Sequence, residues 1–224
     1  MFLLEVGDIE SAKEKFNRIL ELQPDFALAL FYLGEIAFDN CDYERAVPFF
    51  NQALKEDNTL TGPRYRLAQY ALMRGLWKEA ANFLVSELKL GPEDVDTLVS
   101  MGSMFLTIGD LDYATHCMMR AIDIDCAHAQ AYYYLGLVSA AKGQFEEAAE
   151  FFAHTLDISP EHISALRDSA VVYLAMGRLA DAARRIKKAL PLADDDPQLK
   201  TLGRRVRLLQ ATERIRDFLS RLKP

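Results

Sequence analysis

Small and hydrophobic residues recur along this chain with a period of 34 positions. Alanine occupies one position of the repeat six times, at Ala12, Ala46, Ala80, Ala114, Ala148 and Ala182. The position five residues earlier is usually glycine: Gly7, Cys41, Gly75, Gly109, Gly143 and Gly177. Bulky apolar residues fill further positions in phase with these two. Self-similarity at a fixed period predicts an array of equivalent supersecondary units.

Each unit is predicted to be a helical hairpin, with a first helix (A) and a second helix (B). Apolar residues recur at spacings of three and four, which favours helices over strands. The glycine position would end helix A in a left-handed cap, and Asp8, Asp42 and Asp110 would then cap helix B. The A helices are expected near 27–39, 61–74, 95–107, 129–141 and 163–175. The B helices are expected near 8–22, 42–56, 76–89, 110–123, 144–157 and 178–191.

One unit shows a recognisable signature most clearly. Its residues are Tyr132, Leu135, Gly136, Gly143, Phe145, Ala148, Phe152, Leu156 and Pro160. This set resembles the signature of the tetratricopeptide repeat family, with Tyr132 where tryptophan is usual. The resemblance covers about residues 1–194 and implies an all-α fold, a right-handed superhelical solenoid of antiparallel helix pairs. Four residues depart from the expected apolar or small positions: Arg64, Glu87, Thr155 and Ser169.

The repeats predict a solenoid over residues 1–196. It would comprise a truncated first repeat, 1–24, and five repeats, 27–58, 61–92, 95–126, 129–160 and 163–194. Because the first B helix has so few residues before it, we expect the sequence to be an excerpt of a longer protein, or a partner to cover that end.

The 34-residue pattern fails after Asp194-Asp195-Asp196-Pro197. Residues 197–224 are predicted to form a basic amphipathic helix that caps the last repeat, because solenoid ends need a polar outer face. Its apolar residues are Leu199, Leu202, Val206, Leu209, Ile215, Phe218, Leu219 and Leu222, and its arginines are Arg204, Arg205, Arg207, Arg214, Arg216 and Arg221. The alternatives are a surface for nucleic acid or acidic membrane, or a dimer contact.

Charge is distributed unevenly along the chain. The 224 residues have a net charge of −7. Residues 1–177 carry 13 Lys and Arg against 27 Asp and Glu, whereas residues 178–224 carry 13 against 6. Three cysteines cannot all pair within one chain, and their spacing fits no disulfide framework. We therefore expect a reducing, cytoplasmic location.

The sequence offers no catalytic constellation. Nucleotide-binding, zinc-protease and nucleophile-elbow motifs do not occur. His116, Cys117, Cys126 and His128 form the only Cys/His cluster, and its spacing does not match a zinc finger or ribbon. We therefore predict a non-enzymatic protein without a cofactor or a bound metal.

A second stripe of residues on the A helices lies roughly 140° from their core-facing side. The family resemblance implies that this stripe lines a concave groove that binds peptides. The predicted site residues are Leu28, Phe31, Glu35, Tyr65, Gln69, Val99, Ser103, Gln130, Tyr133, Leu137, Arg167 and Val171. We expect the rings of Phe31, Tyr65 and Tyr133 to be exposed, as anchors for a partner.

The predicted function is a protein–protein interaction scaffold that binds a peptide or amphipathic helix in an apolar and aromatic groove. The acidic surround would suit a helix with a basic edge. Family members that clamp a peptide carboxylate use Lys, Arg and Asn, but here the corresponding positions are Phe31, Tyr32, Glu35, Gly62 and Arg66. A chaperone-tail partner is therefore not expected, and neither nucleic acid nor membrane is favoured. The alternatives are a regulatory or targeting region of a larger multidomain enzyme, and an assembly protein that self-associates through its ends.

Overall fold

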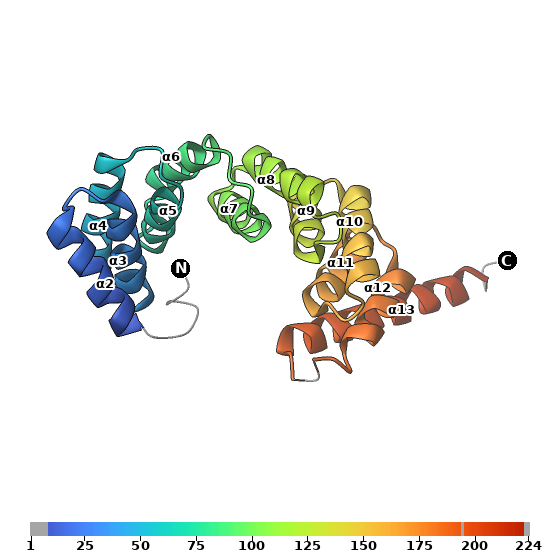
Figure 1. The fold of residues 1–224 in the computed structure, drawn as a ribbon. Helices are drawn as coiled ribbons and strands as arrows, with labels where there is room; N and C mark the ends of the chain where they lie inside the picture. Colours follow the sequence, from blue (N-terminus) through green and yellow to red (C-terminus); the bar gives the residue numbers. More distant parts are fainter. Residues whose placement is uncertain (1–8, 194, 222–224) are drawn as a thin grey trace. The chain divides into compact units, whose positions relative to one another are not determined.

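The computed structural model describes residues 9–193 and 195–221, with side chains described up to residue 216 (Figure 1). Within those residues the fold is all-helical. The helices are α2 (Ile9–Leu22), α3 (Ala27–Asp39), α4 (Tyr43–Glu56), α5 (Pro63–Met73), α6 (Trp77–Leu88), α7 (Val95–Ile108), α8 (Leu111–Ile124), α9 (Ala129–Ala141), α10 (Phe145–Ile158), α11 (Ile163–Ala175), α12 (Leu179–Ala189) and α13 (Pro197–Arg221).

The predicted hairpins are confirmed. The A helices are α3, α5, α7, α9 and α11, and the B helices are α2, α4, α6, α8, α10 and α12. Every helix end lies within two residues of its predicted position. The predictions for Gly7, Asp8, Asp194 and residues 222–224 lie outside the described residues.

The turns inside the hairpins use the predicted left-handed caps. All four described glycines of the glycine position have positive φ, and Cys41 adopts the same conformation with φ 60°. At Gly109 the backbone N–H donates to the carbonyl of Leu106 at 3.1 Å, and the N–H of Asp110 donates to Phe105 at 2.9 Å. The carboxylates of Asp42 and Asp110 then accept from backbone N–H groups of the next helix, as predicted.

The two helices of each hairpin approach closely, which explains why small residues recur at the same positions of the repeat. The six alanines of the repeat are 0–1% exposed. At Gly34 a Cβ atom would lie 2.6 Å from the ring of Phe50, and at Gly136 it would lie 2.6 Å from the ring of Phe152. Such contacts are too short for any side chain, so the B-helix ring packs directly on the glycine backbone.

Helix A also has a periodic cap that the sequence analysis missed. The side chains of Asp94, His128 and His162 accept hydrogen bonds from backbone N–H groups three residues later. Asp196 does the same at the start of α13. These four residues are spaced by 34 positions, so the signal was present in the sequence, but histidine is not among the usual N-cap residues.

Two of the four residues that depart from the family pattern, Thr155 and Ser169, make hydrogen bonds within their own helices. The Thr155 hydroxyl donates to the Phe151 carbonyl, and the Ser169 hydroxyl donates to the Leu166 carbonyl. Their polar groups are thereby satisfied inside the core.

The other two departures are Arg64 on α5 and Glu87 near the end of α6, and both make hydrogen bonds to the segment that precedes α5. Arg64 donates to the Asn58 carbonyl at 2.6 Å, and Glu87 accepts from the backbone N–H of Gly62. Glu87 is 1% exposed and its second carboxylate oxygen has no partner. Burial raises the pKa of this carboxyl group.

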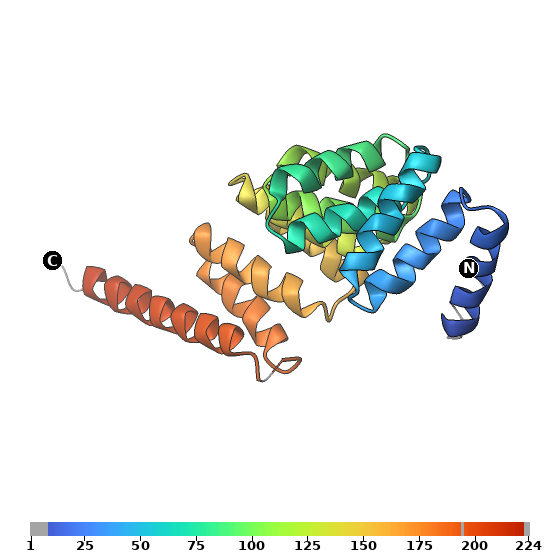
Figure 2. The same ribbon diagram turned by 90° about the vertical axis from the view of Figure 1, so that its left-hand side faces the viewer.

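The chain divides into two compact units, Met1–Glu93 and Asp94–Pro224. The regular 34-residue repeat does not predict this division. In unit 1, the hairpins α3/α4 and α5/α6 pack on each other, and α2 packs on α3. In unit 2, the hairpins α7/α8, α9/α10 and α11/α12 stack in order, and α13 packs along α12 (Figure 2).

Candidate functional site

The twelve predicted site residues lie on A helices of both units, and we call them the A-helix stripe. Unit 1 contributes Leu28, Phe31 and Glu35 from α3, and Tyr65 and Gln69 from α5. Unit 2 contributes Val99 and Ser103 from α7, Gln130, Tyr133 and Leu137 from α9, and Arg167 and Val171 from α11. Each part of the stripe is described within its own unit.

A hydrogen-bonded network spans α3 and α5 in unit 1. Arg66 donates to both carboxylate oxygens of Glu35 at 2.7 Å, which is the bidentate geometry that arginine favours. Arg66 also donates to the amide oxygen of Gln69 at 3.1 Å, and Gln69 donates to the phenol of Tyr65 at 2.9 Å. The helical periodicity predicted Glu35, Tyr65 and Gln69 on one surface, but the role of Arg66, which joins them, was not predicted from the sequence.

Arg66 is further occupied by two neighbours on α3. Its guanidinium lies 5.0 Å from the ring centre of Phe38, and it approaches the carboxylate of Asp39 at 3.5 Å. The Arg66 side chain is 23% exposed, whereas that of Asp39 is 67% exposed. This arginine therefore serves the internal packing of unit 1, while Asp39 leaves negative charge at the edge of the stripe.

The ring of Phe31 is only partly exposed. It covers Gly62, where a Cβ atom would meet the ring at 2.6 Å, and it packs at 6.0 Å between centroids against Phe50. Leu28, one turn earlier on α3, is 40% exposed. Phe31 therefore contributes a partly covered ring, and Leu28 supplies the more accessible apolar group of unit 1.

In unit 2 the predicted exposure of Tyr133 is wrong. Tyr133 is 8% exposed, and its hydroxyl donates to Asp168 on α11 at 2.8 Å. Its ring lies 4.8 Å from the ring of His162 and 5.9 Å from that of Phe152. Burial, together with the Asp168 carboxylate, raises the pKa of the phenol. The next hairpin covers this ring because α11 packs against both α9 and α10.

Val99 is buried for a related reason. It is 6% exposed on α7, which contacts α9 of the following hairpin. A helical wheel gives the direction of a side chain, but it does not show how much of that direction the next hairpin covers. Tyr133 and Val99 are therefore part of the core rather than free surface groups.

The remaining polar groups of the unit 2 stripe are also paired. Arg167 donates to Asp168 at 2.9 Å, so this carboxylate serves both Arg167 and Tyr133. The Gln130 amide oxygen lies 3.1 Å from Nε2 of His162. Burial lowers the pKa of His162. The stripe thus presents few charges that are free to bind a ligand.

Two apolar side chains remain accessible on the stripe. They are Val171 on α11 in unit 2, which is 49% exposed, and Leu28 on α3 in unit 1, which is 40% exposed. Leu137 and Ser103 of the unit 2 stripe are half-buried. Asp96, at the start of α7, has a side chain that is 90% exposed, 3.4 Å from His128. The stripe of unit 2 therefore combines an accessible apolar group with an exposed carboxylate.

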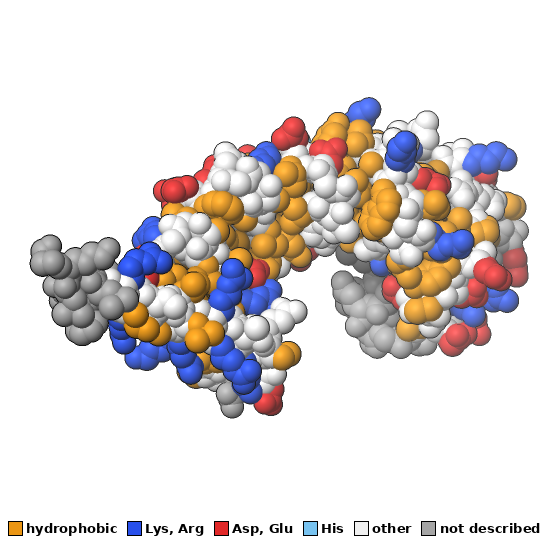
Figure 3. Space-filling model, turned by 180° about the vertical axis from the view of Figure 1, so that it is seen from behind, with side chains coloured by type: hydrophobic (Ala, Val, Ile, Leu, Met, Phe, Trp, Pro, Cys, Tyr) orange, Lys and Arg blue, Asp and Glu red, His pale blue; other side chains and the backbone are white. Residues whose placement is uncertain are grey.

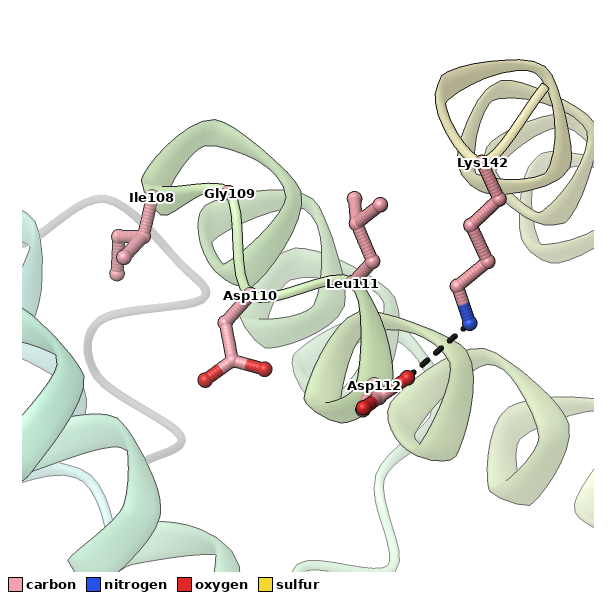
Figure 4. Close-up of a pocket in the computed structure, with 6 residues that line it drawn as sticks. All are labelled: Ile108, Gly109, Asp110, Leu111, Asp112 and Lys142. Atoms are coloured by element: carbon pink, nitrogen blue, oxygen red, sulfur yellow. Dashed lines mark hydrogen bonds and ion pairs between the residues drawn. The ribbon is translucent and has the colours of Figure 1, made fainter.

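A shallow depression in unit 2 has a different character. It lies at the turn between α7 and α8, and Figure 4 shows Lys142 reaching from the end of α9 to Asp112. The two charged groups are 3.1 Å apart, and Ile108 and Leu111 point away from this pair. The carboxylate of Asp110 caps α8. These groups stabilise the turn and do not converge on a common point.

The predicted absence of a metal site rested on the Cys/His cluster. Among the described residues, no group of three or more His, Cys, Asp or Glu is placed to hold a metal ion. Cys117 is buried, and its burial raises the pKa of the thiol to about 12. Cys126 is exposed, and His128 caps α9. Across the same described part of the chain, no helix combines the length and apolar character needed to cross a bilayer.

These features define a class of protein: stacked antiparallel helical hairpins that repeat every 34 residues, with a left-handed cap, usually glycine, inside each hairpin. Tetratricopeptide repeat models match residues 3–60 and 101–163, and a second such model matches residues 139–206. Because the matched segments cover more than half of the sequence, the chain belongs to the tetratricopeptide repeat family. The repeats support a protein–protein interaction scaffold, and this fold is typically non-enzymatic.

Known relatives are distant in sequence. A tetratricopeptide repeat-containing protein, trd-1 of Caenorhabditis elegans, is 21% identical over 197 residues, covering 86% of this chain and 25% of that protein. The TPR repeat-containing protein MJ1428 of Methanocaldococcus jannaschii is 25% identical, covering 75% and 32%. The chain therefore spans about a quarter to a third of these curated relatives.

Solved structures share the fold. The crystal structure of YrrB, described as a TPR protein with an unusual peptide-binding site, superposes with a TM-score of 0.76. It is 21% identical, and the match covers 86% of this chain and 99% of YrrB. At this level of identity the similarity shows the fold alone.

Proposed function

We propose that the A-helix stripe binds an extended or helical segment of a partner protein, with no catalytic chemistry. The observation that supports this most directly is the exposure of Leu28 and Val171 on A helices, 40% and 49%. Most polar side chains of the stripe in each unit are already paired with one another. Binding a partner would therefore not require the desolvation of unpaired charged groups. An accessible apolar group amid satisfied polar groups is suited to a protein partner.

The preferred segment would carry apolar residues flanked by Lys or Arg. Asp39 in unit 1 and Asp96 in unit 2 leave exposed carboxylates beside the stripe, with side-chain exposures of 67% and 90%. A partner's C-terminal carboxylate would find no free cation in unit 1 at Arg66, because Glu35 already engages it. A carboxylate clamp is therefore not part of the proposal.

The proposed location is a reducing compartment such as the cytoplasm. Cys41, Cys117 and Cys126 are free thiols, and two of them are exposed. Exposed thiols stay reduced in the cytosol, whereas in the oxidising environment of secreted proteins they tend to form disulfides. Probing cytosolic, membrane and secreted fractions for the native protein would test this proposal.

Selection of peptides from a random display library would test the binding proposal. Peptides selected on the wild type would be titrated against Leu28→Glu, Val171→Glu and the matched control Leu22→Glu, which alters an 80% exposed residue of α2. We expect apolar sequences with basic flanks, and an affinity loss of about tenfold or more in at least one stripe variant. Unchanged affinity in both stripe variants would overturn the proposal.

A further inference from the structure

Helix α13 has two apolar faces, and only one of them packs on the body of unit 2. Leu199 and Val206 are 0% and 2% exposed against α12. Leu208 and Ile215 are 68% and 58% exposed. At 100° per residue, Leu208 and Ile215 differ by about 20° and lie about 160° or more from the buried face. The exposed face is therefore opposite the one that caps the last hairpin.

The second half of α13 extends beyond the helix that it caps. Gln210 donates to the Leu179 carbonyl at the start of α12, and residues 211–216 are all exposed. Figures 1 and 2 both show this part of α13 projecting past α12. A cap alone needs only the first half of this helix, so the exposed half is available for another contact.

The exposed stripe has the spacing of a helix–helix seam. Leu208 and Ile215 are seven residues apart, and Ala211 lies between them at the complementary heptad position. Leu209, at position b, is also 38% exposed, but at 100° per residue it lies toward the buried face. The seam opposite the buried face is therefore narrow, which is typical of a coiled-coil contact, whereas a helix that lies on lipid has a broader apolar face. The small Ala211 side chain would allow a second helix to approach closely.

The flanks of this seam are basic. Heptad positions e and g of the described part are Arg205, Arg207, Thr212 and Arg214. None of them is acidic, and all four are exposed. Figure 3 shows Lys and Arg side chains gathered around hydrophobic ones at this end of the chain. Positions e and g set partner choice in helix pairs through their charges.

We propose that the exposed face of α13 docks an acidic amphipathic helix of a partner protein, with Leu208 and Ile215 in the seam and arginines along both flanks. Charge complementarity selects this occupant, because Glu or Asp at the partner's flanking positions would face Arg205, Arg207 and Arg214. A second copy of α13 would place arginine rows against each other, which is unfavourable. This surface goes beyond the proposed function, since it lies outside the A-helix stripe.

The test uses the full chain and two synthetic helical peptides of about four heptads. Both carry leucine at positions a and d, and they differ only in Glu or Lys at positions e and g. Affinities would be measured by fluorescence anisotropy. We expect the Glu peptide to bind at least about tenfold more tightly than the Lys peptide. The double variant Leu208→Ser/Ile215→Ser should lose about tenfold or more, whereas the exposed control Leu22→Ser should not.

A charge-reversed variant makes the test specific. Arg207→Glu/Arg214→Glu should prefer the Lys peptide, while its circular dichroism and melting temperature stay at wild-type values because both positions are exposed. Equal binding of the two peptides, or an unchanged preference in this variant, would overturn the proposal. The proposal would also be overturned if the chain bound neither peptide but instead self-associated, or bound phosphatidylserine vesicles, and lost that binding in Leu208→Ser/Ile215→Ser. The stripe variants Leu28→Glu and Val171→Glu should bind the Glu peptide normally, so this surface and the A-helix stripe can fail separately.

Discussion

The phenol of Tyr133 on α9 donates a hydrogen bond to the carboxylate of Asp168 on α11 at 2.8 Å. The two residues belong to consecutive A helices, so this bond joins neighbouring hairpins of unit 2. Because the tyrosine is 8% exposed, its ring and hydroxyl contribute to stability rather than to a free surface.

Two substitutions of Tyr133 separate these contributions. Tyr133→Phe removes only the hydrogen bond and should cost about 1–2 kcal/mol, since the acceptor is charged and Arg167 still pairs with it. Tyr133→Ala also removes the buried ring and should cost about 3–5 kcal/mol. Urea unfolding of both variants would measure these costs. Wild-type stability of Tyr133→Ala would show that the ring is not in the core.

A larger side chain at the alanine position of the repeat should clash with the other helix of the hairpin. Ala148 is 0% exposed on α10, within the core of unit 2. Ala148→Leu should overpack the contact between the two helices of its hairpin and destabilise by about 1–3 kcal/mol. The matched control is Ala180→Leu on α12, where the alanine is exposed. Equal melting temperatures for the two variants would contradict the close approach of the helices.

Helix α13 should stabilise unit 2 through its buried face alone. Leu199→Ala should cost about 2–5 kcal/mol, because Leu199 is 0% exposed in the core of unit 2. Leu208→Ala should change stability by less than about 0.5 kcal/mol. Thermal unfolding of the two variants would distinguish them. A similar cost for both would mean that the exposed face also packs within the chain.

Glu87 predicts a pH dependence of stability in unit 1. Burial raises the pKa of its carboxyl group in the folded protein above its value in the unfolded chain. The folded state therefore holds this proton more tightly, so the stability that it contributes is present at low pH and is lost as pH rises through the folded pKa. Glu87→Gln removes the titration and keeps an acceptor for the Gly62 N–H.

The measurement is the melting temperature of both proteins between acidic and neutral pH. We expect the wild type to lose stability relative to Glu87→Gln as the pH rises. The control is Glu79→Gln on the same helix, which makes the same substitution at an exposed side chain. A constant gap between the wild type and Glu87→Gln would mean that Glu87 does not titrate differently on folding.

The sequence alone predicted the hairpins well because local rules govern them. Cys41 was expected at a left-handed cap from its phase alone, and it does adopt positive φ. Ala148 and its equivalents were expected at close helix contacts, and they are buried. These features depend on positions within one hairpin, where helical periodicity and capping chemistry decide the structure.

The surface was harder to predict, because it depends on contacts between hairpins. The direction of Tyr133 was correct, but its burial depends on the hairpin that follows. The roles of Arg66 and His162 were missed, since each acts on a residue more than 30 positions away. Single-helix patterns carry no information on such pairings.

Site-specific photo-crosslinking would test the central claim that the A-helix stripe receives the partner. A benzophenone amino acid would replace Leu28, Leu137 or Val171, with Gln52 and Glu150 on the B helices as exposed controls. Irradiation with the selected peptides should give adducts at one or more stripe positions and none at the controls. Adducts at the control positions alone, or none at any stripe position under saturating peptide, would contradict the account.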